Sequence, residues 1–534
     1  MGLRPSFLPL GPIVIPLFFG IVLALCPVGW RKPSLLRGTT LLALFLTGLT
    51  LGLLLFIPER TKWVASWDLS RGIAFAPQKG EFSLGLLLIG LLFLFELASW
   101  GASVSPKRQA ALLWLLGATV AASMAWNSVS FCLAWGVADL AFLGIEAVQF
   151  PERGAPWRAR RAWGRMASTS LAVVGSALLW GASEPEMARL PVLLLALAAL
   201  LRMGLYPLPG AGGTGALPVF SLGLGGGLWL GVASLGLLHL PRQWVLALGG
   251  AFILLMGLLV ALSPRWEDAL PWLYQQGLGL LVLLPLLAPE EVKGLAPLFF
   301  LFLVGGWGLA WAGRMLAARE QEDRFPWGGL LAFLGVASLS GWPLTTGMVA
   351  RWALLHASAK GIGSKELFLW MALGGLFAQT AGWPIFLQVK KALLALPTWG
   401  QVRKELRVPQ LVSLLVGLCF LLFGLHPPLF GQLFQSLSWK RLLAAQRGEE
   451  LLLLAVVLVP HVGSYYLWRY FLRTRPRHRG RRGFALEGLY GVVQYLWERG
   501  QYLGGRLLLA LEERLILGWT LLWALAVILY FLHE

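Results

Sequence analysis

The sequence predicts an all-α polytopic membrane protein, and three observations favour that fold class. Apolar residues make up 57% of the 534 and charged residues only 13%, whereas soluble domains carry about 25% charged residues. The apolar residues form stretches of about 18 to 24, long enough for a helix to cross the hydrocarbon core of a bilayer. Runs such as 451–459 (LLLLAVVLV) are apolar on every side, which is typical of a helix and not of alternating barrel strands.

About sixteen stretches satisfy that length, so about sixteen transmembrane helices are expected. They are residues 8–28, 38–57, 82–100, 110–127, 129–148, 168–184, 189–207, 216–238, 244–262, 269–288, 294–313, 328–349, 366–388, 409–427, 450–470 and 514–532. Lys and Arg number roughly 26 in loops after odd-numbered stretches and roughly 12 after even-numbered ones, which places the odd loops in the cytoplasm. We therefore expect a multi-pass protein of a bacterial cytoplasmic (inner) membrane, with both termini on the outer side.

The formal net charge of +19 is concentrated in short loops between these stretches. The most basic loops are residues 153–165, 390–407 and 469–482. The positive-inside rule and anionic lipid headgroups account for such loops. We therefore interpret them as solvated loops that set the topology, with the lipid bilayer and not nucleic acid as the surrounding partner.

Residues 484–513 differ from the spans because apolar and charged residues alternate there at helical spacing. No apolar core of 18 residues lies within them. This pattern predicts an amphipathic helix along the cytoplasmic surface, immediately before the last span. Such a helix would contact either lipid or neighbouring subunits, and the sequence favours neither.

Ionisable side chains within the spans are the candidate site residues, because a charge in hydrocarbon is costly unless it lines a hydrated path or is paired. Asp139 lies in the middle of the fifth span, too deep to reach either surface. Arg202 lies in the seventh span and Arg351 follows the twelfth. Glu96 and His461 are further candidates for the proton path. Each also has a structural interpretation, namely packing, snorkelling to an interface or a bond to a backbone carbonyl.

Prolines follow or precede the two arginines. Pro207 and Pro209 come shortly after Arg202, and Pro343 lies eight residues before Arg351. Proline removes a backbone donor and interrupts a helix. We therefore predict helix breaks at both places, as in spans that line an ion path.

The sequence contains no motif for cofactor or nucleotide chemistry. Cys26, Cys132 and Cys419 are far apart, within apolar stretches, and form no metal-ligand spacing. No phosphate-binding loop, HExxH motif or nucleophile elbow is present. We therefore predict no cofactor, no metal site and no catalytic residues, and we do not expect this chain alone to drive transport with ATP.

One motif resembles a known family. Residues 338–351 (SLSGWPLTTGMVAR) resemble the pattern S-L-x-G-x-P-x-x-x-G-F-x-x-K of the antiporter-like membrane subunits of respiratory complex I (NADH-quinone oxidoreductase), membrane-bound hydrogenases and Mrp cation/proton antiporters. Residues 127–140 (NSVSFCLAWGVADL), 202–209 (RMGLYPLP) and 215–238 are similar to three other family segments, in the family's order. The resemblance covers nearly the whole chain.

The resemblance implies two inverted five-helix repeats, each with a broken helix. The organisation that follows is residues 1–109 for spans one to three, 110–240 for the first repeat, 241–390 for the second repeat, 391–480 for spans fourteen and fifteen with a basic loop, 481–513 for the lateral helix and 514–534 for the last span.

The resemblance also implies a proton path of Glu and Lys at mid-membrane, and this chain departs from it. Gly136 stands at the position of the family's glutamate, although Asp139 follows one helical turn later. Arg202 replaces the lysine of the seventh span, Leu230 that of the eighth, and Arg351 is the charge of the twelfth. Arginine stays protonated at nearly any depth, so it orients water or a carboxylate but shuttles protons poorly. The chain is thus a divergent member that lacks several channel lysines.

These observations predict a membrane subunit of a redox-driven, H⁺-translocating complex of the complex I or hydrogenase type, with a degenerate proton path and a structural role. Other membrane subunits would be its partners and would carry the redox chemistry. Two alternatives remain open: a free-standing or two-component transporter of ions or inorganic carbon with the same fold, and a non-conducting scaffold subunit. The sequence leaves undecided the electron donor, the neighbouring subunits and H⁺ versus Na⁺.

Overall fold

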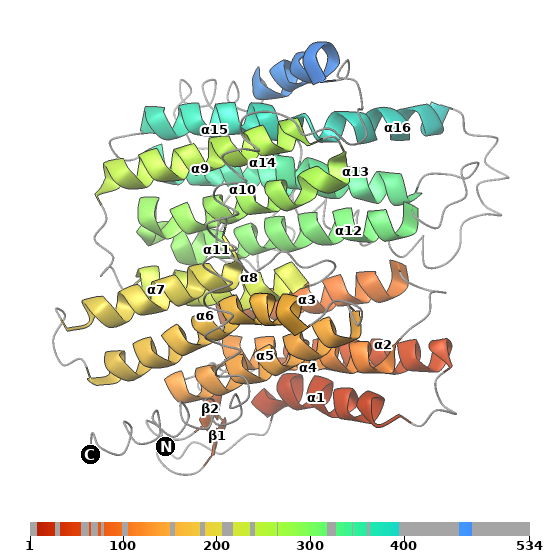
Figure 1. Ribbon diagram of the computed structural model, residues 1–534, viewed down its shortest axis with the longest axis vertical. Helices are drawn as coiled ribbons and strands as arrows, with labels where there is room; N and C mark the ends of the chain where they lie inside the picture. Colours follow the sequence, from red (N-terminus) through yellow and green to blue (C-terminus); the bar gives the residue numbers. More distant parts are fainter. Residues whose placement is uncertain are drawn as a thin grey trace.

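The computed structural model describes residues 8–26, 32–54, 63–65, 73–75, 79–98, 105–125, 127–149, 155–181, 187–205, 217–234, 241–263, 265–317, 327–343, 345–359, 364–394 and 459–472. Within these residues the chain is almost entirely helical. The helices lie roughly side by side in a long stack, and their order in space broadly follows the sequence from α1 at one end to α15 and α16 at the other (Figure 1).

The helices of the N-terminal half are α1 (Gly11–Ala24), α2 (Pro33–Leu54), α3 (Lys79–Ala98), α4 (Pro106–Ser123), α5 (Ser128–Gln149), α6 (Ala155–Gly181), α7 (Arg189–Met203) and α8 (Leu217–Ser234). Those that follow are α9 (Arg242–Leu262), α10 (Trp266–Leu287), α11 (Val292–Phe300), α12 (Gly306–Ala317), α13 (Trp327–Ser340), α14 (Thr346–Ala359), α15 (Ser364–Gln379) and α16 (Gly382–Leu394). A π-helical turn at Leu301–Gly305 joins α11 to α12, and residues 459–466 form a further helix with a π-helical end at Leu467–Leu472.

Two short strands, β1 (Trp63–Ala65) and β2 (Ile73–Phe75), pair antiparallel between α2 and α3. The sequence analysis expected no strand in this loop. Each strand has only three residues, too few to produce the alternating pattern by which a strand is recognised. The all-α class is otherwise confirmed.

Among the described residues, four helices are long and apolar enough to cross a membrane by length and composition: Pro33–Leu54, Arg242–Leu262, Trp266–Leu287 and Leu295–Ala317. Shorter apolar helices of 10–17 residues, such as Gly11–Ala24 and Ser130–Ile145, accompany them. The first of the four exposes Leu42, Phe45 and Leu49 to about half of their accessible area. Such exposed apolar surface suits a lipid environment.

Most helices pack against helices that are close to them in the sequence. A few contacts also join the helices α1–α8 to the helices α9–α16. Helix α4 packs on α1 and α5, α6 on α7, and α7 on α8, whereas α9 packs on α10 and α15, and α12 on α13. Helix α3 also contacts α12, and α8 contacts α10. Helices α3 and α8 therefore join the N-terminal helices to those that follow α9.

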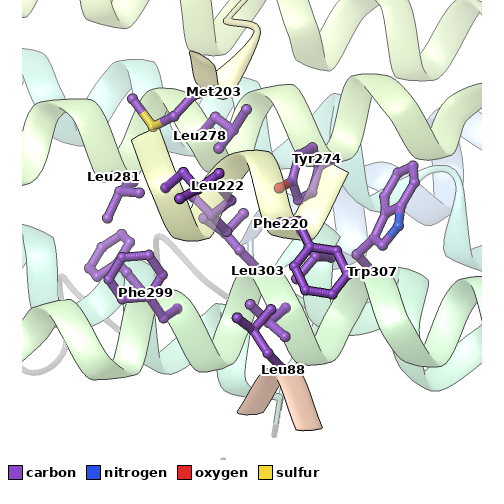
Figure 2. Close-up of a cluster of buried hydrophobic side chains, with 14 of the residues drawn as sticks. Leu88, Met203, Phe220, Leu222, Tyr274, Leu278, Leu281, Phe299, Leu303 and Trp307 are labelled. Atoms are coloured by element: carbon purple, nitrogen blue, oxygen red, sulfur yellow. The ribbon is translucent and has the colours of Figure 1, made fainter. Parts of the chain in front are cut away.

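The centre of the hydrophobic core lies between the helices α3, α7 and α8 on one side and the segment α10–α12 on the other (Figure 2). Figure 2 shows buried side chains from α3, α7, α8, α10 and the α11–α12 segment converging around the two α8 residues Phe220 and Leu222. Both of these, together with Phe299 and Leu303, have no exposed area. Apolar packing therefore couples the halves without a gap at this level.

The predicted twelfth and thirteenth spans are each interrupted. The expected span 328–349 is divided into α13 and α14, and the latter continues to Ala359; the expected span 366–388 is divided at Thr380–Ala381 into α15 and α16. The first interruption contains Pro343, which confirms the helix break predicted there. The second has no proline, so the sequence pattern did not reveal it.

The basic segment 153–165 was interpreted as a solvated loop, and this was wrong for its end. Helix α6 begins at Ala155, and Arg165 is 5% exposed. The predicted span began at residue 168, because a stretch chosen for apolar residues excludes the charged residues before it. The helix itself begins earlier. A buried guanidinium in its first turns was therefore missed.

Several predictions fall outside the described residues. These are the span at 409–427, the amphipathic helix 484–513, the last span and the prolines Pro207 and Pro209. The inverted repeats, the number of spans and the domain boundaries remain predictions.

Candidate functional site

A buried ion pair joins Asp139 on α5 to Arg202 on α7. Arg202 donates from Nη1 to Oδ1 of Asp139, and the two side chains are 0% and 9% exposed. Thr169 on α6 donates its hydroxyl to the other carboxylate oxygen, Oδ2, at 2.5 Å. Three consecutive helices thus converge on one carboxylate, which has no room to reach a lipid headgroup.

Aromatic rings complete the surroundings of the pair. The guanidinium carbon of Arg202 lies 5.1 Å from the ring of Trp135 and 5.3 Å from that of Phe142. The guanidinium carbon of Arg165 also lies 5.1 Å from the centroid of the Phe142 ring. Cation–π contacts stabilise a guanidinium that has left water. Trp135, Asp139 and Phe142 are spaced four and three residues apart, so one face of α5 presents all three.

Two donors of Arg202 remain unused. Its Nε and Nη2 atoms are buried and have no hydrogen-bond partner among the described residues. A guanidinium has five N–H groups, so the single carboxylate contact leaves hydrogen-bonding capacity for water. The arrangement therefore provides a fixed positive charge beside a carboxylate, and both are held by neighbouring helices.

Gly136, at the position where the family has glutamate, does not face this pair. A side chain built there would meet no heavy atom within 4 Å, whereas Asp139 contacts Arg202 directly. Asp139 therefore lies on the face of α5 that contacts Arg202 of α7. That it substitutes for the glutamate of the resembled family stays a prediction.

Helix α7 ends directly after Arg202, at a left-handed glycine. Gly204 has a φ of 67° and caps the helix with its backbone N–H on the carbonyls of Leu200 and Leu201. This conformation costs glycine little and other residues more. The helix therefore ends before Pro207 and Pro209, which lie outside the described residues, and the break predicted at these prolines stays a prediction.

Arg351 forms a second buried cluster, on α14. Its Nη2 donates to the side-chain oxygen of Gln276 at 2.7 Å and to the backbone carbonyl of Leu339 at 3.3 Å. Gln276, which is fully buried, donates in turn to the carbonyls of Ile253 and Gly374 at 2.9 and 3.1 Å. The structure therefore does not bring Arg351 to the Asp139–Arg202 pair; it holds this arginine among α9, α10, α13 and α15.

The end of α13 before Arg351 is built like the end of α7 after Arg202. Helix α13 ends at Gly341, whose φ is 75°, and the backbone N–H of Trp342 donates to Ala337 at 2.9 Å. Thr345 then caps α14, because its hydroxyl accepts from the backbone N–H of Met348 at 3.4 Å. Each arginine thus lies beside a helix end formed by a left-handed glycine.

Three consecutive residues of α10 contact the start of α8, the glycine that ends α7, and Arg351 of α14. Tyr274 donates to the carbonyl of Pro218 at the start of α8, at 2.9 Å. Gln275 donates to the carbonyl of Gly204 at 2.8 Å, and Gln276 holds Arg351. A movement of either break would therefore disturb the same turn of α10.

Glu96 and His461 belong to other clusters. Glu96 accepts from the amide of Gln109 at 3.1 Å, and Arg37 donates to its backbone carbonyl at 3.0 Å, among α2, α3 and α4. His461 packs edge-on against Trp342 with ring centroids 4.6 Å apart, so it touches the break beside Arg351. Of the five candidates, only Asp139 and Arg202 contact each other.

The sequence analysis missed Gln276, Gln379 and Thr169, which hold the charged groups or line the breaks. The sequence could have marked Gln276 as a candidate. Two adjacent amide side chains in an apolar span (YQQG) are costly unless they are hydrogen-bonded, so they point to a buried polar site. Thr169 gave no signal, since a threonine in a span normally bonds its own helix.

We expect Gln276→Leu to lower the stability of the protein by about 3 kcal/mol, because it removes three hydrogen bonds and leaves buried carbonyls and a charged donor unpaired. The measurement is the apparent Tm of the detergent-purified chain. The control is Gln388→Leu, an exposed glutamine of α16, which should leave the Tm unchanged. Equal Tm values for both variants would contradict the role given to Gln276.

Comparisons with known proteins agree on the fold. No family model and no curated protein sequence matches the chain. Among solved structures, 93% of the chain aligns with a chain of the Mrp complex from Dietzia sp. DQ12-45-1b, with a TM-score of 0.66 and 13% identity, and it spans 60% of that chain's length.

Two further structures match over most of their own length. A chain of the membrane-bound sulfane sulfur reductase, an archaeal respiratory membrane complex, gives a TM-score of 0.62 at 13% identity, over 80% of this chain and 96% of that one. A chain of respiratory complex I from Thermus thermophilus gives 0.57 at 16% identity, over 78% and 98%. The resemblance found in the sequence is thereby confirmed at the level of fold, and the protein is a multi-pass membrane protein that shares its fold with chains of these membrane complexes.

Proposed function

We propose that the chain is a membrane subunit of a redox-driven, proton-translocating complex of the complex I or membrane-bound hydrogenase type, in which other subunits carry out the electron transfer. The observation that carries this proposal is the Asp139–Arg202 pair. It is a carboxylate and a guanidinium buried where three helices converge, close to the left-handed glycine that ends α7. A charge pair at a broken helix is the arrangement from which proton paths in membranes are built.

In this proposal Asp139 is the proton-accepting group and Arg202 is a fixed charge. Arg202 and the Thr169 hydroxyl each donate a hydrogen bond to the Asp139 carboxylate. When Asp139 takes up a proton, its attraction to Arg202 falls. The rings of Trp135 and Phe142 then remain as the neighbours that stabilise the guanidinium. The two unused donors of Arg202 would orient water along the path.

The second arginine makes the path a degenerate one. Arg351 lies in its own cluster with Gln276 and does not contact the first pair. Because arginine does not release its proton, neither charge replaces a titrating lysine. We therefore expect slower proton transfer through this chain than through a subunit with lysines at these positions.

Proton flux tests the proposal. The chain is purified with the partners that bind it, reconstituted in liposomes with a pH-sensitive dye, and driven by its electron donor or by an imposed pH gradient. We expect Asp139→Asn to reduce proton flux by at least about tenfold, as loss of a proton-transferring group does, and Asp139→Glu to retain part of it. The control is Asp268→Asn, which changes an exposed carboxylate in the first turn of α10.

The alternatives give different outcomes. Flux by the purified chain without partners would favour a free-standing transporter of the same fold. Unchanged flux in a fully assembled Asp139→Asn complex would contradict the proposal and favour a non-conducting scaffold, a role that the enclosed aromatic setting of Arg202 also suits. Replacing Na⁺ in the assay distinguishes a sodium-coupled protein from a proton-coupled one.

A further inference from the structure

Arg351 is a buried cation that lacks a carboxylate partner among the described residues. Its exposed fraction is 7%, and both acceptors of its guanidinium in the described part of the chain are neutral: the amide oxygen of Gln276 and the carbonyl of Leu339. Arg202, at the corresponding helix break, is paired with Asp139. The two arginines are therefore held differently, and only one charge is compensated.

Part of the guanidinium has no protein acceptor. Both neutral acceptors bind Nη2, and the buried Nε atom has no partner in the described part of the chain. A charged donor without an acceptor is costly in a low-dielectric interior. The cost falls when an anion lies next to the guanidinium.

The space for such an anion is present. A small pocket is lined by Arg351, Trp352, Gln379 and the two glycines Gly341 and Gly375. A methyl group on Gly341 would lie 2.6 Å from Nε, and one on Gly375 would lie 3.2 Å from Nη1. The absence of these side chains is what leaves the guanidinium accessible from the pocket.

From this geometry we propose that the pocket beside Arg351 binds one small monovalent anion of the halide class, such as chloride. The anion accepts hydrogen bonds from the free edge of the guanidinium and balances its charge. Guanidinium groups are weakly hydrated and bind anions through fixed N–H donors. This inference is independent of proton translocation, because it concerns a resident ion and not the path through Asp139.

A second buried polar atom in the pocket is the side-chain oxygen of Gln379, which can accept a hydrogen bond from a water molecule bound to the halide. The side-chain oxygen of Gln379 is buried and has no donor among the described residues, while its amide nitrogen is fixed by the carbonyl of Gly341 at 3.0 Å. A water molecule that donates one hydrogen to this oxygen and the other to the halide satisfies both. The pocket is small, which favours a halide over a bulky oxyanion.

Equilibrium binding of radioactive chloride tests the proposal. The full-length chain, purified in detergent and exchanged into sodium gluconate, is expected to bind chloride saturably with one site per chain. Its apparent Tm should be higher in sodium chloride than in gluconate at equal concentration. Arg351→Gln should weaken chloride binding by at least about tenfold, since hydrogen bonds to a charged group are lost.

Two further variants keep the result decisive. Gly375→Ala retains the arginine and narrows the pocket, so it should weaken chloride binding even if Arg351→Gln fails to fold. Arg314→Gln removes an exposed cation of α12 and should leave chloride binding unchanged. Folded wild-type protein without saturable chloride binding, or equal binding by wild type and both pocket variants, would overturn the proposal; a carboxylate supplied by another segment or subunit would give that outcome.

Discussion

Replacing Asp139 with alanine is expected to lower the stability of the protein by about 3–5 kcal/mol, the range found when one partner of a buried ion pair is removed. Arg202 would then keep its charge at 0% exposure without a counter-ion. The Thr169 hydroxyl would also lose its acceptor. The measurement is the yield and apparent Tm of the purified, monodisperse chain.

The double variant Asp139→Leu with Arg202→Leu distinguishes the lost pair from lost packing. Replacing both partners with apolar residues removes the uncompensated charge, so most of the stability should return. Asp268→Ala, at an exposed position, is the single-site control. If the double variant is less stable than Asp139→Ala alone, the pair contributes more than charge compensation and this account is wrong.

Replacing Gly347 with alanine should cause a loss of similar size. A Cβ atom at Gly347 would lie 1.7 Å from the backbone oxygen of Ser338, so α14 would have to move away from the end of α13. The backbone oxygen of Ser338 cannot move aside as a side chain does by changing rotamer. We therefore expect this overpacking to lower the free energy of unfolding by about 3 kcal/mol or more. The movement would also displace Arg351, one turn further along α14.

The measurement is again the apparent Tm, with chloride binding as a second readout of the Arg351 pocket. Gly227→Ala and Gly136→Ala are matched controls, because a Cβ at either position meets nothing within 4 Å. In a helix these changes should be neutral or stabilising by about 0.5–1 kcal/mol. A Gly347→Ala protein with wild-type Tm would show that α13 and α14 do not pack closely.

Sequence patterns located most helices because membrane insertion depends on local apolar content. The break at Pro343 was also predictable, since proline acts on its own helix. The strands β1 and β2, the break at Thr380 and the burial of Arg165 were not. Each of these depends on contacts with distant residues or on segments too short to carry a period.

The site was predictable only in part. A charge at mid-span marks Asp139 as a candidate from sequence alone, but its partner is 63 residues away, and the partner of Arg351 is 75 residues away. Sequence reasoning assigned Asp139, Arg202 and Arg351 to one proton path. In the structure Asp139 pairs with Arg202, because α6 packs on both α5 and α7. Arg351 bonds to Gln276 instead, because α14 contacts α10 and α15.

By itself the sequence determined that the chain lies in a membrane, that it is helical, and that Asp139, Arg202 and Arg351 are candidates for buried charges. Composition, run length and proline position are local properties, and the cost of a charge in hydrocarbon holds whatever the neighbours are. The tertiary structure alone decided which charge is neutralised by which partner, and where each broken helix ends. Those outcomes depend on which helix faces approach within hydrogen-bonding distance, and no local pattern encodes that approach.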